Sequence, residues 1–384
     1  MNLPQSLGLY LSAPFCRSKC SYCNFASQVY APGVYAEYCE LLAREVTLAA
    51  ASDGLQAATL ESIYWGGGTP TLLPKSGWEA IMAAVRSAFA LAPEVEHTAE
   101  AAPGTLDAER LKTLRAAGVN RLSLGAQSFE DAELRAVGRL HRGAMIGEDI
   151  ARARAAGISN ISLDLIAGLP HQTTDSWQHS VRSAMATEVP HLSLYMLEVD
   201  EDSRLGNELL AGGVRYHAHA VPDEDLIADA YEWACAALER EGWEQYEISN
   251  FARPGFASRH NLGYWRRRPY LGCGLDAHSL LLAPEPRRFA NPDTLDAYCA
   301  PLRQGRLPRQ VPVRLTPTAE REEHYFLGLR CNQGVEVGEQ DPQQAAVAPL
   351  VADGLLTRDG SRIALTARGR MVANRVLVSF LEPG

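Results

Sequence analysis

Three cysteines stand close together near the start of the chain, in the segment "SAPFCRSKCSYCNF". Cys16, Cys20 and Cys23 follow a C-x3-C-x2-C spacing, and an aromatic residue, Phe25, follows instead of a fourth cysteine. Soft thiolates are the ligands that iron–sulfur clusters prefer, and a cubane [4Fe–4S] cluster has four iron corners to fill. Three cysteines fill three corners, so we expect the fourth iron to stay open for an exogenous chelating ligand.

The same spacing also suits a zinc ion that a distant His or Cys completes. Position favours the cluster, because the loop directly follows an expected strand at 7–11 and therefore lies at the carboxyl-end face, where barrels of alternating strands and helices place their chemistry. The remaining cysteines are isolated in the sequence, and we expect them to be buried, inert thiols: Cys39, Cys235, Cys273, Cys299 and Cys331.

A glycine triplet in "YWGGGTPTLL" forms the second candidate site. Gly66, Gly67 and Gly68 let main-chain groups approach a ligand with no Cβ in the way, and Thr69 adds a hydroxyl before Pro70 closes the turn. Alone, such a triplet is more often a turn than a ligand cradle. Its place after the second expected strand puts it beside the three-cysteine loop, which favours the cradle.

Short apolar runs alternate with helical patterns through the first half of the chain. The expected strands lie at 7–11, 62–65, 96–100, 121–124, 161–165 and 192–196, and the expected helices at 34–50, 79–90, 108–117, 131–137, 144–156 and 174–187. This alternation predicts an α/β fold with βα units around a parallel sheet. About six units are fewer than the eight of a closed barrel, so we predict a partial, open (β/α)6 barrel, with a flat doubly wound sheet as the alternative.

The alternation ends after Val199. An amphipathic helix is expected at 226–240, and the proline-rich segment 286–310 is expected to cross the surface as a linker. Beyond residue 315, helices at 318–329 and 342–353, a hairpin with a strand at 362–365 and a final helix at 367–381 resemble a small winged-helix module. We predict three parts: a barrel core at 1–200, an extension at 201–314 and a winged-helix-like domain at 315–384.

Composition limits the function classes. The chain has 384 residues with 46 acidic and 36 basic side chains, a net charge of −10, which argues against a nucleic-acid partner. The start has no basic region followed by a long apolar stretch, and no run of about 18 apolar residues occurs, so we expect no membrane insertion and no export. Eight cysteines are too sparse for a disulfide scaffold, which favours a cytoplasmic location.

These motifs, together with "NRLSLGAQSF", "SLDLIAGLPHQT", "YEISNFA" and "SRHNLGYW", resemble the radical S-adenosylmethionine (radical SAM) family. The resemblance is to the branch with oxygen-independent coproporphyrinogen III oxidases and heme chaperones, and it runs from Tyr10 to the last helix. It implies that the open iron of the cluster binds the amino and carboxylate groups of S-adenosylmethionine.

The resemblance also carries over, by motif, a set of residues that would border or hold this cofactor: Tyr10 and Tyr22 near the cluster, Gly67, Gly68 and Thr69 at its methionyl part, and Glu100, Gln127, Arg139 and Asp164 around its pocket. A sulfonium cation with a ribose and an amino acid end suits these residue types, because carboxylates accept from its hydroxyls and amine while amide and guanidinium groups donate to its carboxylate. The family's usual histidine before the cysteines is Ser12 here, and its usual asparagine before "PGT" is Ala102.

Two features concern heme. Decarboxylating oxidases of this branch typically carry a further cysteine where Phe25 stands, and "HNLGYW", from His260 to Trp265, matches a motif that the family associates with heme binding. A neutral imidazole is a good axial ligand for heme iron, while aromatic rings offer flat surface to a porphyrin. The alternative for His260 is a structural histidine with satisfied ring nitrogens. His278 is a second candidate axial ligand, and the arginines at 266–268 could meet propionates or form a solvated loop.

The resemblance thus implies a cytosolic heme chaperone that binds a [4Fe–4S] cluster, S-adenosylmethionine and heme. Such a protein would hand heme to an acceptor hemoprotein, such as a respiratory one, and would take electrons for its cluster from a reductant protein. The alternative is a coproporphyrinogen III oxidase, in which a radical derived from the cofactor takes hydrogen from a porphyrinogen propionate. A third hypothesis is a zinc-stapled protein with no redox role. The sequence leaves open whether the chain forms a homodimer.

Overall fold

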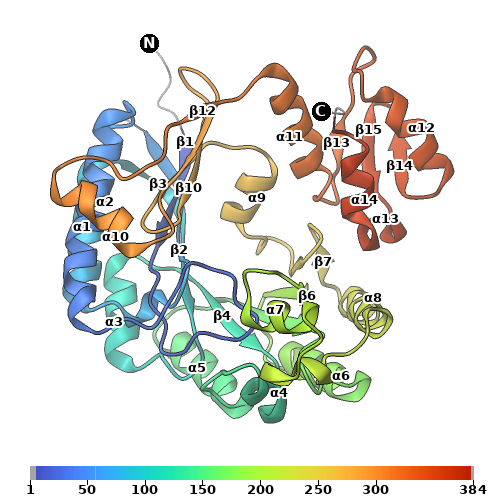
Figure 1. The fold of residues 1–384 in the computed structure, drawn as a ribbon, viewed down its shortest axis with the longest axis horizontal. Helices are drawn as coiled ribbons and strands as arrows, with labels where there is room; N and C mark the ends of the chain where they lie inside the picture. The colour runs from blue at the N-terminus through green and yellow to red at the C-terminus, as the bar shows by residue number, and fades with distance from the viewer. Residues whose placement is uncertain (1–5, 57, 382–384) are drawn as a thin grey trace.

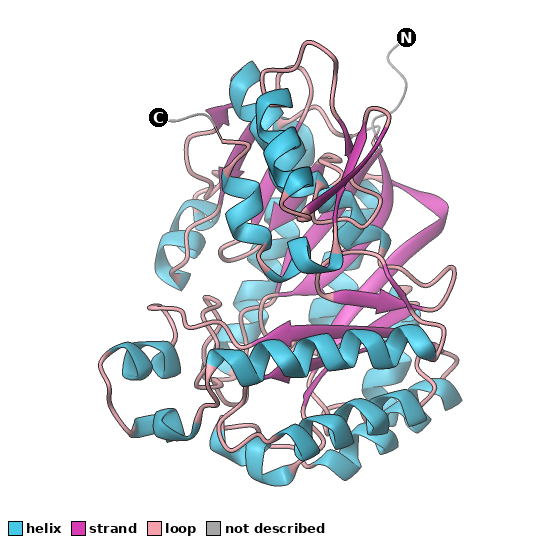
Figure 2. Cartoon of the chain, turned by 90° about the vertical axis from the view of Figure 1, so that its right-hand side faces the viewer, coloured by secondary structure: helices cyan, strands magenta, loops and turns pink. Residues whose placement is uncertain are grey.

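Six parallel strands form the centre of the protein. The computed structural model describes residues 6–56 and 58–381. The strands follow one another in chain order: β1 (Ser6–Ser12), β2 (Thr59–Gly66), β3 (Ala90–Ala101), β4 (Arg121–Gln127), β5 (Asn160–Ala167) and β6 (His191–Met196). The connecting helices are α1 (Gly33–Ser52), the 3-10 turn η1 (Pro70–Leu72) with α2 (Lys75–Ala88), α3 (Ala108–Ala117), α4 (Asp131–Ala136), α5 (Gly143–Ala155) and α6 (Thr174–Ala186). These helices lie along the outside of the sheet (Figure 1) (Figure 2).

Shorter strands extend this sheet at both edges. Beside β1 lie β9 (Tyr270–Cys273), β10 (His278–Leu281), β11 (Arg287–Ala290) and β12 (Val313–Arg314), and beside β6 lie β8 (Asn250–Ala252) and β7 (Glu244–Gln245). The described strands therefore run from β12 at one edge to β7 at the other without closing. A doubly wound sheet reverses its strand order at a switch point, whereas β1 to β6 are sequential, so the partial-barrel prediction is confirmed.

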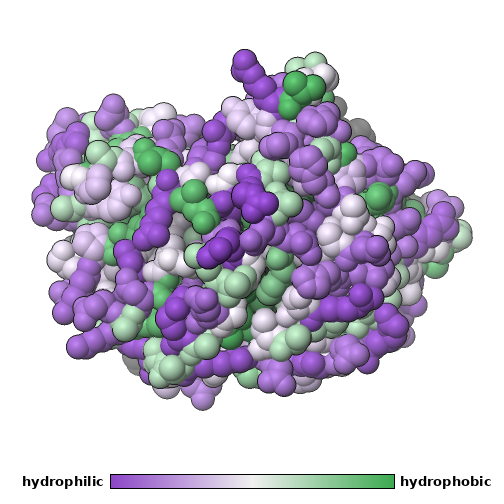
Figure 3. Space-filling model, turned by 90° about the horizontal axis from the view of Figure 1, so that it is seen from below, coloured by the Kyte–Doolittle hydropathy of each residue, from purple (hydrophilic) through white to green (hydrophobic). Residues whose placement is uncertain are grey.

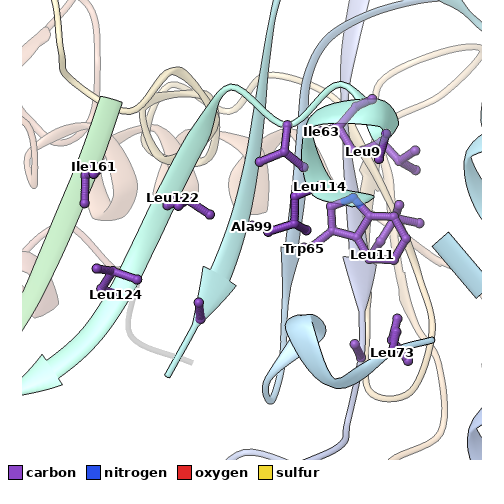
Figure 4. Packing of buried hydrophobic residues seen from close by; sticks show 14 of the residues in the cluster. Leu9, Leu11, Ile63, Trp65, Leu73, Ala99, Leu114, Leu122, Leu124 and Ile161 are labelled. Carbon is purple, nitrogen blue, oxygen red and sulfur yellow. The ribbon is translucent and has the colours of Figure 1, made fainter. Parts of the chain in front are cut away.

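The two faces of these strands differ in chemistry. Large apolar side chains such as Leu9, Leu11 and Trp65 point toward the helices and are fully buried (Figure 4). Alternate positions face the concave side of the sheet, where Tyr10 stacks on Tyr64 at 6.2 Å. Because successive residues of a strand point to opposite faces, each strand contributes to the core on one side and presents polar groups on the other.

Residues 197–314 connect the barrel to the C-terminal part. They contain α7 (Arg204–Leu210), the 3-10 segment η2 (Arg215–Ala220), α8 (Glu224–Arg240), α9 (Arg259–Trp265) and α10 (Leu295–Arg303). The prediction that 286–310 is an irregular linker is wrong, because β11 and α10 lie within it. Helix α10 packs beside α1 (Figure 1), and its Tyr298 hydroxyl donates a 2.6 Å hydrogen bond to the buried Glu45 carboxylate. Burial of this face of α10 outweighs the weak helical signal of a segment with many prolines.

The C-terminal part has its own small sheet and core. It contains α11 (Pro317–Gly328), β13 (Val335–Glu336), α12 (Gln344–Ala352), β14 (Leu356–Asp359) and β15 (Arg362–Leu365), followed by α13 (Ala367–Met371) and α14 (Ala373–Val378). The predicted single helix at 367–381 is broken at Val372, where φ is −120°. After this break, α14 and Phe380 pack on the inside of the module, with Phe380 stacked on Tyr325 at 4.8 Å. The predicted order of helix, helix, hairpin and helix is present, with β13 added between the first two helices and the last helix divided in two.

The face of the molecule formed by α4, α5 and α6 is mainly polar (Figure 3). Seen from the side of α4, α5 and α6, it is largely hydrophilic with small scattered hydrophobic areas (Figure 3). Within residues 6–56 and 58–381, no helix has the length and apolarity that a bilayer crossing requires.

Candidate functional site

The three-cysteine loop is held in place by main-chain hydrogen bonds. The loop leaves β1, and Cys16 N donates to Gln28 O at 3.0 Å, which joins its two ends. Thr69 N donates to Phe15 O at 2.8 Å, so the loop is also tied to the glycine turn after β2. The two motifs that the sequence separates by some fifty positions, Cys16 to Gly66, are therefore neighbours at the carboxyl ends of the strands.

One pocket of about 620 Å³ collects most of the predicted site residues, and we call it the cysteine pocket. Its predicted members are Cys16, Cys20, Tyr22, Cys23, Gly68, Thr69, Glu100, Gln127, Arg139 and Asp164. Tyr10 and Gly67 line an adjacent cavity instead, and His260 lines a third one. The site inferred from sequence is thus largely a single place in the fold, with three of its predicted residues outside it.

The cysteine thiols are partly shielded and have polar neighbours. Arg139 Nη1 lies 3.6 Å from Cys20 Sγ, and Ser27 Oγ lies 3.9 Å from Cys23 Sγ. Burial raises the pKa of the Cys16 and Cys23 thiols. All eight cysteines are free thiols. The three of the loop are therefore available as ligands, and a bound metal would have to offset the cost of ionising them.

No group of three or more His, Cys, Asp or Glu side chains among the described residues converges tightly enough to hold a single metal ion. A cubane cluster binds each thiolate at a different iron, so its ligands line a cavity and need not meet at one point. Three thiols on the wall of one pocket fit that donor arrangement.

A buried cation stands beside the thiols. Arg139 donates a hydrogen bond to Gly125 O as well as approaching Cys20. Burial lowers the pKa of its guanidinium, but nearby Tyr22 and Cys20 raise it by more, so the net pKa is above the ordinary value. Arg139 is therefore a fixed positive charge on the cysteine side of the pocket.

Two acidic groups line the same pocket. Tyr64 OH donates to Glu100 Oε1 at 2.9 Å, and Ser123 Oγ lies 3.3 Å from both carboxylate oxygens of Asp164. Burial raises the pKa of Glu100 to about 8, with the Tyr64 hydrogen bond opposing and Asp164 adding to the rise. Burial also raises the pKa of Asp164. A cationic ligand would favour the ionised form of both carboxyls.

The glycines of the turn after β2 mainly allow the cysteine loop to pack closely against it, and only secondarily leave space for a ligand. A Cβ at Gly68 would lie 2.6 Å from Ala13 O and 2.9 Å from Phe15 N, so glycine lets the cysteine loop approach β2. Gly67 has a φ of +88°, which a residue with a side chain rarely adopts. The turn therefore fixes the cysteine loop against the sheet, and Gly68 also lines the cysteine pocket.

Sequence reasoning missed two contributors. Tyr64 and Ser123 orient the two carboxyls, and both occupy concave-side strand positions near Glu100 and Asp164. Their position in the strand alternation is the signal that would have found them. Gln127 ends β4 with a φ of 68°, an unfavourable backbone conformation that costs about 1–3 kcal/mol and clusters at functional sites.

The two departures from the family pattern are both close to the site. Ser12 is buried, and its carbonyl accepts from Tyr38 OH at 2.8 Å. Ala102 lines the cysteine pocket. Ala102 has no hydrogen-bonding side chain, so the amide that is usual in the family at this position has no counterpart here.

His260 lies inside the barrel, at the end opposite the cysteines. It is 3% exposed, Ser62 Oγ lies 2.8 Å from its Nδ1 and Tyr264 OH lies 2.7 Å from its Nε2. Burial, with Arg121 nearby, lowers its pKa to about 3, so the ring is neutral. Both ring nitrogens are thus engaged in hydrogen bonds, and an iron bond to His260 requires one of them to break.

Helix α9, which carries His260, is capped by a buried carboxylate from the sheet. Glu96 Oε1 accepts from His260 N at 3.0 Å, and Glu96 Oε2 accepts from Arg259 N at 3.0 Å. Free N–H groups at the start of a helix favour a negative partner. The "HNLGYW" motif therefore anchors α9 in the barrel interior.

Comparisons with known proteins agree with this fold. The radical SAM superfamily model matches residues 10–184, and the HemN C-terminal domain model matches residues 315–372. The structure of coproporphyrinogen III oxidase HemN from Escherichia coli, a radical SAM enzyme by its description, superposes with a TM-score of 0.83 and 25% identity, covering 98% of this chain and 90% of that one. The fold and the three-cysteine pocket thus define a radical SAM protein.

Relatives that match nearly the full chain identify the family within the radical SAM proteins. The heme chaperone HemW of Mycobacterium tuberculosis is 35% identical, covering 98% of this chain and 95% of its own length. The heme chaperone HemW of Bacillus subtilis is 34% identical, covering 97% of this chain and 98% of its own length. The chain belongs to the HemW family.

Proposed function

We propose that this protein is a heme chaperone of the HemW type, which binds heme and transfers it to an acceptor hemoprotein. The observation that carries the proposal is the 35% identity to a relative named heme chaperone HemW over 98% of the chain. Phe25 adds support, because a cysteine is typical at this position in the decarboxylating oxidases that the sequence also resembles.

We propose a [4Fe–4S] cluster and S-adenosylmethionine as the resident cofactors. Cys16, Cys20 and Cys23 would hold three irons, and the cluster, when bound, supplies an open iron for the amino and carboxylate groups of S-adenosylmethionine. The charges of the cysteine pocket suit this ligand, because the Arg139 cation lies on the thiol side while Glu100 and Asp164 lie within the same cavity.

The roles proposed for the other residues remain those implied by the motifs. Tyr22, Gly68, Thr69, Glu100, Gln127, Arg139 and Asp164 would bind or orient S-adenosylmethionine from the cysteine pocket, and Tyr10 and Gly67 would border it from the adjacent cavity. Glu100 would accept hydrogen bonds from cofactor hydroxyls or from the amine, and Tyr64 would hold that carboxyl in place.

Several finer proposals accompany the function. We propose a cytoplasmic site of action, a respiratory protein as acceptor and a reductant protein that supplies electrons to the cluster. A homodimer in solution is a separate proposal, to be tested by sedimentation. We also keep the division into a core at 1–200, an extension at 201–314 and a C-terminal domain at 315–384, supported by the HemN C-terminal model that begins at residue 315.

The decisive experiment is a heme titration of anaerobically purified, reconstituted protein. We expect a Soret shift that saturates at one heme per chain, followed by loss of this band when an apo-hemoprotein acceptor is added and gains the heme. Absence of any Soret shift would refute the proposed function.

The alternative function is an oxygen-independent coproporphyrinogen III oxidase. The observation that favours it is the superposition on HemN of Escherichia coli, with a TM-score of 0.83. Incubation of the reduced protein with coproporphyrinogen III and S-adenosylmethionine distinguishes the two functions: sustained formation of protoporphyrinogen IX would establish the oxidase, whereas we expect none.

A further inference from the structure

A second cavity of about 460 Å³ opens beside the cysteine pocket. Its wall comes from the cysteine loop, the ends of β1 and β2, helix α9, strands β9 to β11 and helix α11. We call it the His278 groove, and its lining includes Tyr10, Phe25, Tyr264, Trp265, His278 and Arg288. Phe25 lines both the groove and the cysteine pocket, so the two cavities share a wall.

The groove contains an accessible imidazole. The His278 side chain is 68% exposed, and its Nε2 lies 4.0 Å from Asp276 Oδ1. At 4.0 Å the Asp276 carboxylate lies beyond hydrogen-bond distance, so within the described residues both ring nitrogens of His278 are free to bind a metal. The contrast with His260 is sharp, because that ring is 3% exposed and both of its nitrogens are hydrogen-bonded.

Flat aromatic rings line the same groove as this imidazole. Tyr264 and Trp265 reach the groove from α9, and Phe25, which is 60% exposed, reaches it from the cysteine loop. Tyr264 also packs edge-on against Tyr270, with ring centroids 4.5 Å apart. Aromatic rings on three elements give the groove apolar surface of the kind that a porphyrin face covers.

The groove also has a cation for an anionic substituent. Arg288 donates to Tyr270 OH at 3.2 Å and to Glu323 Oε1 at 2.5 Å. Arg267 Nε donates to the other oxygen of Glu323 at 2.7 Å, so Glu323 keeps a cationic partner when Arg288 turns toward a ligand. A guanidinium pairs well with a carboxylate.

We propose that the His278 groove is where the protein holds its heme, with His278 as the axial ligand, the aromatic rings against the porphyrin and Arg288 paired with a propionate. In this arrangement His260 supports α9 from inside the barrel and does not bind iron. The inference rests on the proposed heme-chaperone function and adds the site of the cargo.

The test is hemin titration of the anaerobically reconstituted full-length protein, with magnetic circular dichroism to identify a nitrogen ligand. We expect His278→Ala to lose the imidazole signature and to bind hemin about tenfold more weakly or worse, a loss of about 1.4 kcal/mol. His278→Gly with added imidazole should regain the signature. The control is His219→Ala, which removes an exposed histidine elsewhere and should behave as the unmodified protein.

The outcomes separate this inference from the proposed function. Hemin binding by the unmodified protein that is unchanged in both spectrum and affinity in His278→Ala would overturn the His278 site and leave the chaperone function standing. No hemin binding by the unmodified protein would refute the function itself. A folded His260→Ala variant that lacks the imidazole signature would also overturn the proposal.

The propionate contact has an independent readout. We expect Arg288→Gln to weaken hemin binding several-fold while leaving the binding of hemin dimethyl ester, which lacks the carboxylates, unchanged. Equal weakening for both ligands would show that Arg288 acts only through the structure of the groove and would remove it from the proposed site.

Discussion

Arg139 Nη1 lies 3.6 Å from Cys20 Sγ, which puts a buried positive charge against one of the three thiols of the cysteine loop. The charge is held in place by a second hydrogen bond, from Arg139 to Gly125 O. A cluster bound by these thiols would therefore gain an electron beside a fixed cation. Charge and hydrogen bonds near a cluster are main determinants of its reduction potential.

The first prediction concerns this cation. Arg139→Met removes the charge and keeps much of the side-chain volume, so we expect the reduction potential of the reconstituted cluster to fall by roughly 60 mV, a tenfold change for a one-electron couple. An anaerobic redox titration followed by EPR measures it. Arg142→Met, at an exposed position three residues away, is the control. If the two variants have the same cluster reduction potential, the charge of Arg139 does not affect that potential.

The second prediction concerns the ligands of the cluster. Cys20→Ala should abolish the absorbance near 400 nm and reduce bound iron from about four per chain to near background. Hemin binding should persist, because Cys20 does not line the His278 groove. Cys235→Ala, a control outside the loop, should keep the bound iron with its absorbance and should also keep hemin binding. A colourless unmodified protein that instead carries one zinc per chain would favour the zinc-stapled hypothesis.

The third prediction concerns the pH dependence of S-adenosylmethionine binding. Burial raises the pKa of Glu100 to about 8 from an ordinary 4.5, so the carboxyl is mostly protonated at pH 7 in the ligand-free protein. A cationic ligand prefers the ionised form, so affinity should rise as pH rises through 8. Glu100→Gln should bind about tenfold more weakly at pH 9 and lose this rise. Equilibrium dialysis at pH 6.5 and 9 measures both effects.

The same shift in pKa has a defined effect on stability. The folded protein holds a proton on Glu100 between pH 4.5 and 8 that the unfolded chain releases, so the stability from this group is complete below 4.5 and is lost as pH rises through 8. Glu100→Gln should flatten that part of the pH profile in urea unfolding. Glu109→Gln, at an exposed position, should not alter it.

The fourth prediction concerns the anchor of α9. Glu96→Gln places an amide nitrogen against a backbone donor, so we expect a loss of about 1–3 kcal/mol in unfolding free energy and faster hydrogen exchange at residues 258–265. Glu94→Gln is the matched control, because Glu94 is exposed and contributes only its carbonyl, to Arg259. Unchanged exchange in Glu96→Gln would contradict the anchoring role of this carboxylate.

The barrel was predictable from sequence because its signals are local. Each strand carries an apolar run, and helices such as α3, predicted at 108–117, begin and end as expected. Cysteine spacing and the glycine turn likewise lie in short segments. The residues that gather in the cysteine pocket were reached through family resemblance, because strands far apart in sequence bring Glu100 and Asp164 together.

The misses have a common physical cause. Helix α10 forms because Tyr298 and its neighbours are buried against α1. The break between α13 and α14 lets Phe380 stack on Tyr325. The sequence left His260 open between a heme ligand and a structural histidine, and its hydrogen-bond partners Ser62 and Glu96 come from two strands distant in sequence. Long-range partners of this kind leave no periodic signal in the segment that needs them.

The alternation along β1 has a consequence for engineering. In its seven residues, Leu7, Leu9 and Leu11 hold the sheet to its helices, while Gly8, Tyr10 and Ser12 face the concave side. One strand therefore carries both the packing of the sheet against its helices and the chemistry of the concave side. A protein engineer could change the chemistry of the concave side at Tyr10 and keep the apolar anchors Leu9 and Leu11, whereas Ser12 is itself buried and tolerates less change.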